Sequence, residues 1–242
     1  MSVRGALASM RPYVVTLASA VAAFVAGQIV ATAVLLWWWH GNLHALAAAP
    51  YDGASVTLSV VFLNPVTVAV LLLAVRVHRA NPVEYLALIV PRLRFLTIGI
   101  AGIFLIIGAT DALLFATGRA VVSPFQVISY TSAAAEGWLL PMWIATVLVA
   151  PAGEEIMFRG YLFRGFVRSG RSAWPAIVVI SLLWAGPHQQ YDWTGIAEIF
   201  VAGLFLGWVR WRSGSTLLTF FLHALFNLEG MLETVVQVKH LL

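Results

Sequence analysis

The sequence predicts an all-α protein, a polytopic bundle of seven to eight transmembrane helices. Of its 242 residues, 61% are hydrophobic and only 10% are charged, against about 25% charged residues in an ordinary soluble domain. Several apolar stretches reach the ~20 residues needed to cross a hydrocarbon core of ~30 Å, and the polar segments between them are short. One membrane-embedded unit therefore accounts for most of the chain.

Seven apolar runs, separated by proline, glycine or charged residues, are the predicted spans. The first is too long for the roughly 7 to 15 apolar residues of a signal peptide, so we expect a retained span. The short run Val83–Val90, between two prolines, is predicted as either an eighth span or an interfacial helix. We divide the chain into amino-terminal helices and loops (1–135) and a catalytic core (136–242). The seven runs cover residues 13–38, 56–75, 95–117, 138–167, 174–187, 194–211 and 215–238.

Basic residues at or beyond the ends of the spans fall mostly on one side of this arrangement. Only Arg119 and Lys239 lie on the other side, so the positive-inside rule favours a cytoplasmic amino terminus and seven spans. The basic residues form short groups and no continuous stripe, so we expect no nucleic-acid partner. The cytoplasmic side would hold Arg4, Arg11, Arg76, Arg79, Arg92, Arg94, Arg164, Arg168, Arg171, Arg210 and Arg212.

The fourth run contains Glu154, Glu155 and Arg159 in a sequence otherwise suited to lipid. Each ionisable residue near the bilayer centre costs roughly 2.5 to 3.5 kcal/mol, so three together need partners or a wet cavity. On a helix of ~100° per residue, Glu155 and Arg159 share a face, whereas Glu154 points about 140° away from Arg159. We therefore expect an ion pair between Glu155 and Arg159, with Glu154 free to face a cavity. A purely structural ion pair is the alternative.

Two further polar groups follow in later spans. His188 ends the fifth run, and His223 and Asn227 share one helix face through their i,i+4 spacing. Counted at ~1.5 Å per residue from the cytoplasmic ends, Glu154 and His223 lie about 15 Å deep, and His188 and Asn227 about 21 Å. All four are therefore predicted to converge in the membrane interior. Alone, each could be an interfacial residue or an interhelical hydrogen-bond partner.

These residue types suit hydrolysis of a peptide bond. A carboxylate in a low-dielectric pocket can act as a general base toward water, and histidine can orient that water or protonate the leaving amine. Asn227 and His223 can donate hydrogen bonds to the developing oxyanion. With no cysteine in the chain, a cysteine nucleophile and a thiolate metal site are excluded. Zinc held by Glu154, His188 and His223 stays open, but the His-Glu-x-x-His helix is absent and metal-free catalysis is favoured.

At these residues the chain resembles the CPBP intramembrane protease family, which comprises type II CAAX prenyl endopeptidases and lysostaphin-resistance-like (Abi) proteins. The family pattern is Glu-Glu-x-x-x-Arg, then Phe-x-x-x-His, then His-x-x-x-Asn, and its order and spacing match residues 138–230. One departure is Trp184, where the family usually has Phe.

The resemblance implies roles for the matching residues. Glu154 would be the base that activates water, and His188 would be its partner. His223 and Asn227 would stabilise the oxyanion, while Glu155 and Arg159 would hold the site together. It also implies cleavage of carboxy-terminal tripeptides from prenylated proteins on the cytosolic side of a membrane.

The leading hypothesis is an intramembrane endopeptidase with membrane lipid and a peptide or protein substrate as partners. A non-catalytic scaffold or bacteriocin-immunity protein of the same fold is the main alternative. A small transporter ranks last, suggested by Asp111, Glu198, Glu229 and Glu233 near the span ends. The excess of Arg over Lys and the richness in Ala and Val favour a bacterial plasma membrane over the endoplasmic reticulum. The sequence does not determine the oligomeric state.

Overall fold

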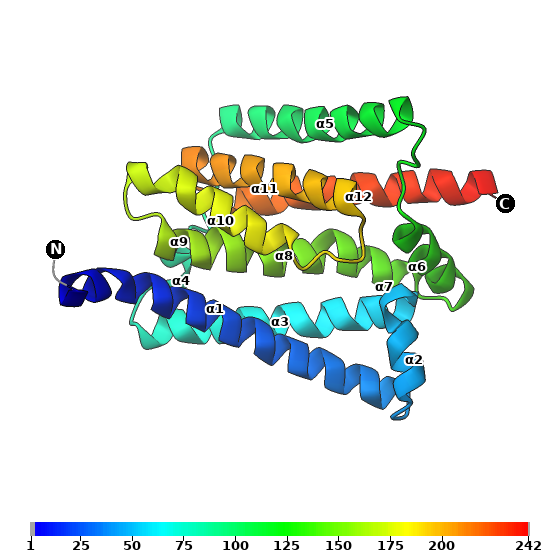
Figure 1. The fold of residues 1–242 in the computed structure, drawn as a ribbon, viewed down its shortest axis with the longest axis horizontal. Coiled ribbons are helices and arrows are strands. Elements are labelled where there is room, and N and C mark those ends of the chain that lie inside the picture. Colours follow the sequence, from blue (N-terminus) through cyan, green and yellow to red (C-terminus); the bar gives the residue numbers. More distant parts are fainter. Residues whose placement is uncertain (1–2, 242) are drawn as a thin grey trace.

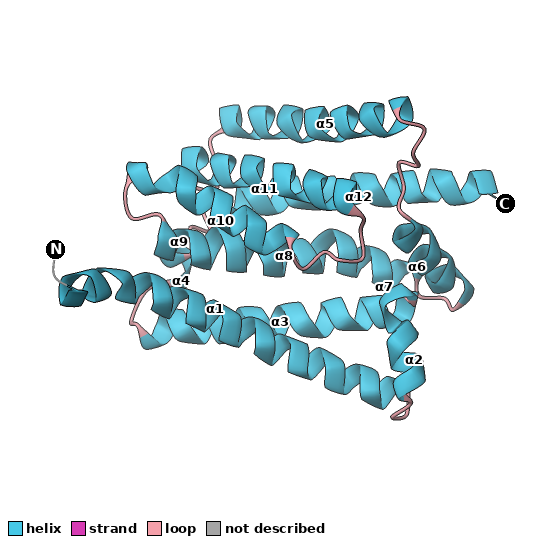
Figure 2. Ribbon diagram, in the orientation of Figure 1, coloured by secondary structure: helices cyan, strands magenta, loops and turns pink. Residues whose placement is uncertain are grey.

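A computed structural model of the chain describes residues 3–241, with side chains other than those of residues 3–11, 45, 48 and 241. All regular structure among the described residues is helical (Figure 2), which confirms the all-α prediction. The long helices run back and forth between the two ends of an elongated bundle (Figure 1).

The elements follow in chain order. They are α1 (Val3–Trp38), α2 (Leu43–Ala48), η1 (Ala49–Tyr51), α3 (Gly53–Val77), α4 (Pro82–Tyr85), α5 (Leu93–Ala116), α6 (Pro124–Ala135), α7 (Leu139–Ile144), η2 (Ala145–Val149), α8 (Ala150–Glu155), η3 (Ile156–Leu162), α9 (Phe163–Phe166), η4 (Gly170–Ser172), α10 (Ala173–Ala185), α11 (Trp193–Ser213) and α12 (Thr216–Leu241).

The helices α1 and α3 form an antiparallel hairpin. Asp52 caps α3, since its carboxylate accepts a hydrogen bond from the Ser55 amide at 2.8 Å. The two backbones approach closely at Gly27, where a Cβ atom would lie 2.6 Å from the Leu63 carbonyl oxygen. A small residue therefore sets how tightly this hairpin packs, as is common between membrane helices.

The segment from α7 to α9 is one continuous helical stretch with two π-helical parts, η2 and η3, on either side of α8. A π-helical turn inserts an extra residue and shifts the side chains that follow it around the helix axis. The straight α-helix assumed for this span is therefore wrong in detail. The short α8 that carries Glu154 and Glu155 lies between the two widened turns.

The last three long helices pack side by side. Gly203 and Gly207 of α11 let it approach α10, because added Cβ atoms would lie 3.0 Å from Ser181 Cβ and 2.8 Å from Ile177 Cγ2. Gly214 then ends α11 with a left-handed φ of 72°, a conformation that glycine adopts without strain. The chain turns there directly into α12.

Within the described part of the chain, five helical segments are long and apolar enough to cross a membrane. The sequence predicted these five and, in addition, α10 and α12 as spans. Both additional segments are helical, but α10 has only 13 residues, about 20 Å of helix at ~1.5 Å per residue. The five are Pro12–Trp38, Gly53–Val77, Leu93–Ala116, Leu139–Phe166 and Trp193–Ser213.

Two short segments differ from the sequence-based expectation. An eighth span at Val83–Val90 is wrong, since only the four-residue α4 is helical there. The polar stretch after α5 contains a helix that the sequence analysis did not predict, α6, which begins at a capping box between Ser123 and Gln126. Such a box satisfies backbone amides that a helix start would otherwise leave unpaired.

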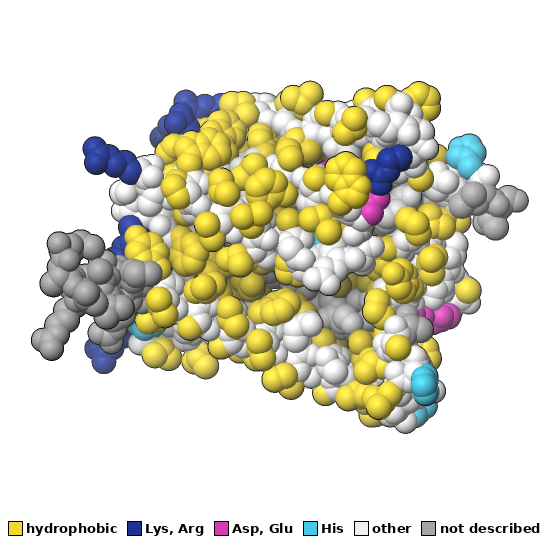
Figure 3. Space-filling view, viewed as in Figure 1, with side chains coloured by type: hydrophobic (Ala, Val, Ile, Leu, Met, Phe, Trp, Pro, Cys, Tyr) yellow, Lys and Arg dark blue, Asp and Glu magenta, His cyan; other side chains and the backbone are white. Residues whose placement is uncertain are grey.

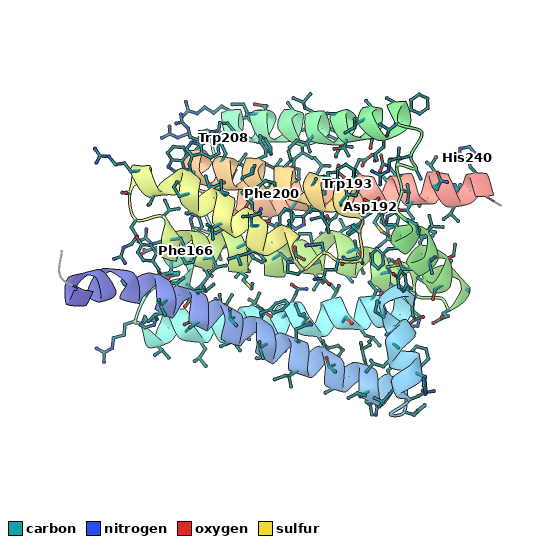
Figure 4. All side chains as sticks on the ribbon, viewed as in Figure 1. Phe166, Asp192, Trp193, Phe200, Trp208 and His240 are labelled. Atoms are coloured by element: carbon teal, nitrogen blue, oxygen red, sulfur yellow. The ribbon has the colours of Figure 1, made fainter. Side chains whose placement is uncertain are left out.

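The two ends of the bundle differ in charge. The basic end is where α3, α9 and α11 finish, and Figure 3 shows dark-blue basic side chains gathered there. The opposite end, the α6 end, holds α2, α6 and the start of α11. In Figure 4, Phe166 and Trp208 lie toward the basic end, while Asp192 and Trp193 lie toward the α6 end. The side chains of Arg4 and Arg11 lie outside the described residues. The basic end carries Arg76, Arg79, Arg92, Arg94, Arg164, Arg168, Arg171, Arg210 and Arg212.

Candidate functional site

A buried ion pair lies at the centre of the bundle. Arg159 Nη1 donates to Glu155 Oε1 at 2.7 Å, and both side chains are essentially inaccessible, at 1% and 0% exposure. Arg159 also donates to the Gly203 carbonyl oxygen at 3.2 Å and lies 4.3 Å from the ring centre of Trp184. The i,i+4 pair expected from the sequence is therefore present, and it ties α8 and η3 to α11.

His223 of α12 completes this buried group. Its Nδ1 lies 3.0 Å from Glu155 Oε1, and the ring is almost wholly buried. A carboxylate at Nδ1 selects the tautomer with the proton on that nitrogen and leaves Nε2 to face outward. Glu155 thus fixes which edge of His223 meets the neighbouring Glu154, a role that the sequence analysis did not assign to it.

Glu154 differs from its neighbour in being accessible. Its side chain is 24% exposed, and its Oε2 lies 4.0 Å from His223 Nε2. The same oxygen accepts a hydrogen bond from Trp184 Nε1 at 2.5 Å. Glu154 and Glu155 therefore have the different surroundings that their helix positions predicted, one facing a cavity and the other buried.

Trp184 is a site residue that the sequence analysis missed. The sequence analysis noted it only as a departure from the family's Phe, yet its indole N–H contacts Glu154 and its ring lies 5.0 Å from that of His223. Phe has no hydrogen-bond donor, so the change adds a polar contact to the candidate base. The available signal was the donor that Trp brings, four residues before His188.

His188 and Asn227 line the same cavity but make other contacts. His188 Nδ1 lies 2.8 Å from the Trp184 carbonyl oxygen, which leaves its Nε2 unengaged by that bond. Asn227 Nδ2 donates to the Thr146 carbonyl oxygen at 2.9 Å, and its other amide hydrogen remains for a further acceptor. Among the described residues, these side chains bond to backbone carbonyl oxygens and not to Glu154.

A cavity of about 360 Å³ joins these residues. Glu154, His188, His223 and Asn227, which the sequence predicted to converge, all line it, as does Trp184. The cavity also receives the acids that had suggested a transporter, from three different helices. These are Asp111, Glu198, Glu229 and Glu233.

Asp192 and Arg119 pair at the edge of the cavity, outside the predicted spans. Asp192 caps α11 by accepting hydrogen bonds from Thr194 and Gly195. Hydrogen bonds from the Thr194 side chain and the Gly195 amide hold the pKa of the Asp192 carboxyl below its usual range. A charged pair therefore marks the edge of the cavity on the α6 side.

The donor set does not fit a zinc ion. Zinc needs ligands that converge at about 2.0 to 2.2 Å on one point. Among the described residues no group of three His, Asp or Glu side chains has that arrangement. The Glu154 oxygen nearest His223 already accepts a hydrogen bond from the Trp184 N–H. That indole N–H is a donor only and cannot ligate a metal. We therefore derive no step through zinc.

Comparison with known proteins places this site in a family. A curated Escherichia coli protein described as an uncharacterized 24.3 kDa protein is 30% identical over 124 residues, which cover 49% of this chain and 57% of that protein. The chain thus aligns with little more than half the length of this relative. No solved structure matches the chain. Residues 136–228, which carry all three motifs, match the family described as Rce1-like, type II CAAX prenyl endopeptidase. Residues 136–228 therefore form a domain of the Rce1-like type II CAAX prenyl endopeptidase (CPBP) family.

Proposed function

We propose that the protein is an intramembrane endopeptidase that hydrolyses a peptide bond near the membrane, with Glu154 as the general base. The observation that carries this proposal is the pairing of an accessible Glu154 carboxylate with His223 Nε2, 4.0 Å away, at the floor of a cavity. The family description supports a protease, although the peptide that this chain cuts need not be prenylated.

The spacing of these two groups suits one bound water. A water at about 2.8 Å from both Glu154 Oε2 and His223 Nε2 makes ordinary hydrogen bonds to each. For atoms 4.0 Å apart, the angle at that water is about 90°, which an ordinary hydrogen-bonded water can adopt. The carboxylate would accept one proton of the water while the imidazole orients it.

The chemistry follows in two steps. The water oxygen attacks the peptide carbonyl carbon as Glu154 takes a proton, which forms a tetrahedral intermediate with a negative oxygen. Asn227, and His223 when protonated, donate hydrogen bonds to that oxygen. Collapse breaks the C–N bond, and the leaving nitrogen receives the proton held by Glu154 or one from His188. The products are a carboxylate and an amine, which balances the added water.

The buried residues support this arrangement and do not take part in bond making. Glu155 holds His223 through Nδ1, and Arg159 neutralises Glu155 at 2.7 Å. Trp184 fixes one oxygen of Glu154. A non-catalytic scaffold would need neither an accessible carboxylate nor a histidine oriented toward it, so these contacts favour the enzyme.

The membrane arrangement is part of the proposal. We infer seven spans, in which α10 and α12 complete the five apolar segments, and a bacterial plasma membrane as the location. Residues 1–135 would then supply the amino-terminal helices and residues 136–242 the catalytic core. The hydrophobic outer faces of α5 and α7 are suited to lipid contact, since Leu105 and Leu140 are 73% and 71% exposed.

The test is cleavage of a library of membrane-proximal peptides by purified protein in detergent. The wild type is compared with Glu154→Gln, and with Glu84→Gln as a control at an exposed acid outside the cavity. Loss of a general base lowers the rate by about 10² to 10⁴-fold. We expect this loss in Glu154→Gln and unchanged cleavage in Glu84→Gln.

Two results would contradict the proposal. Equal cleavage by the wild type and a folded Glu154→Gln would remove Glu154 as the base. No cleavage by any folded variant, together with stable capture of a membrane protein by the wild type and Glu154→Gln alike, would establish the scaffold alternative.

A further inference from the structure

The cavity occupies one half of the bundle. Glu154 and His223 form its floor, and the other helices contribute lining residues from their α6-end halves. In α3 these are Val56 and Val60, close to its start at Gly53. In α11 the first is Thr194 and the last is Ile199, all within the first seven residues of the helix. The space therefore extends from the membrane interior toward the α6 end.

The basic end is closed beneath the floor. The loop after α4 packs against the start of α12, where Thr216 Oγ1 donates to the Leu86 carbonyl oxygen at 2.6 Å and Thr216 N donates to the Ala87 carbonyl oxygen at 2.9 Å. Leu86 is fully buried and packs against Gly160, where an added Cβ would lie 3.1 Å from Leu86 Cδ2. Arg210 Nε joins η3 to α12 by donating to the Arg159 carbonyl oxygen at 2.9 Å and to Thr216 Oγ1 at 3.0 Å. These contacts lie between the site and the basic end.

The cavity reaches exposed residues at the α6 end. Ala120 and Asp192 line the cavity and are exposed, and Arg119, which pairs with Asp192, is partly exposed. Figure 3 shows the exposed acidic and basic side chains of this region on the surface of the bundle. Polar, accessible groups at the edge and polar groups on the floor make a path for a hydrated polypeptide segment.

The charge distribution identifies the compartment. Nine arginines with described side chains lie at the basic end, while Arg119 and Lys239 lie toward the α6 end. Excess Lys and Arg in short loops remain on the cytoplasmic side of a membrane. The α6 end, and with it the opening of the cavity, therefore faces away from the cytoplasm.

We propose that the site is reached from the extracytoplasmic side, so that its substrate is an outward-facing segment of an exported or membrane-anchored polypeptide. That the site binds a substrate rests on the proposed function, whereas the side from which the cavity is reached does not depend on it. This direction is opposite to the cytosolic-side cleavage that the family resemblance implied.

Single-cysteine labelling tests this directly, because the natural chain contains no cysteine. Three variants in spheroplasts receive either a membrane-impermeant maleimide or a small charged methanethiosulfonate. Ala120→Cys reports the edge of the cavity, Thr146→Cys its interior, and Ser169→Cys the basic end. A permeable maleimide after lysis confirms that each thiol is present, and gel filtration confirms the fold.

We expect Ala120→Cys and Thr146→Cys to react in intact spheroplasts and Ser169→Cys to react only after lysis. The reverse pattern would overturn the orientation. Reaction of Ala120→Cys from outside with Thr146→Cys protected until lysis or denaturation would overturn the access route. Labelling requires no activity, so either failure is separate from failure of the protease proposal.

Discussion

The buried pair of Glu155 and Arg159 allows a quantitative test of how the site is held together. Glu155→Gln removes the negative charge and leaves the Arg159 guanidinium, which is fully buried, without a charged partner. Breaking a buried pair from one side costs about 3 to 5 kcal/mol, because the remaining charge stays desolvated. Arg159→Met should cost a similar amount by stranding Glu155.

The measurement is thermal unfolding of the purified variants in one detergent. For a domain of this size, 1 kcal/mol shifts the midpoint by about 2 to 4 °C, so each single variant should unfold roughly 6 to 20 °C below the wild type. The double variant, Glu155→Gln with Arg159→Met, buries no unpaired charge. Its loss should therefore be smaller than the sum of the two single losses by about 2 kcal/mol or more.

Arg119→Gln supplies the control at an exposed ion pair. Its partner Asp192 is more than half exposed and Arg119 about a third, and such surface pairs contribute about 0 to 1 kcal/mol. The reasoning is refuted if the double variant is additive within about 0.5 kcal/mol, the behaviour of independent sites. It is equally refuted if Arg119→Gln destabilises the protein as much as Glu155→Gln.

Three further predictions follow. Gly153→Ala should destabilise the protein by about 1 to 3 kcal/mol, because its Cβ would lie 2.2 Å from Asn64 Oδ1. The control Gly108→Ala, whose Cβ would meet nothing within 4 Å, should stabilise the protein slightly. Equal thermal unfolding midpoints for the two variants would contradict this prediction. Trp184→Phe removes the N–H that donates a hydrogen bond to Glu154. A hydrogen bond to a charged group contributes about 1.5 to 3 kcal/mol, so kcat/KM for peptide cleavage should fall about tenfold or more. An unchanged kcat/KM would show that this contact does not orient the base. Since the donor set does not fit zinc, wild-type cleavage should persist in a chelator, and loss on chelation with recovery on adding zinc would refute the metal-free mechanism.

Helical periodicity and hydropathy were enough to predict several features. The five apolar segments, the all-α class and the i,i+4 contact of Glu155 with Arg159 follow from local sequence, because side chains four residues apart lie on one helix face. The similar depth of Glu154, His188, His223 and Asn227 followed from counting residues along each span, whereas their meeting in one cavity depends on how the helices pack. Side chains that act together must lie at a similar depth, because the helices that carry them cross the same bilayer.

Contacts between helices could not be predicted in this way. Helix rotation and spacing depend on packing, and a π-helical turn changes the rotation without a clear signal in composition. Hence the sequence missed the Trp184 contact with Glu154 and the Glu155 contact with His223. The helix α6 was missed for a different reason, because its start is a local signal, the Ser123–Gln126 capping box, that the sequence analysis did not use.

The sequence by itself determined which residues must be placed in the membrane and which end of the bundle is basic, because transfer energy and charge are properties of each residue. Only the tertiary structure decided where the cavity opens. Leu86 and Thr216 close the basic end, although they are 130 positions apart, and the opening lies where α6 and the start of α11 leave Ala120 and Asp192 exposed. A cavity is the space that packed helices leave between them, so its direction exists only once distant segments have come together.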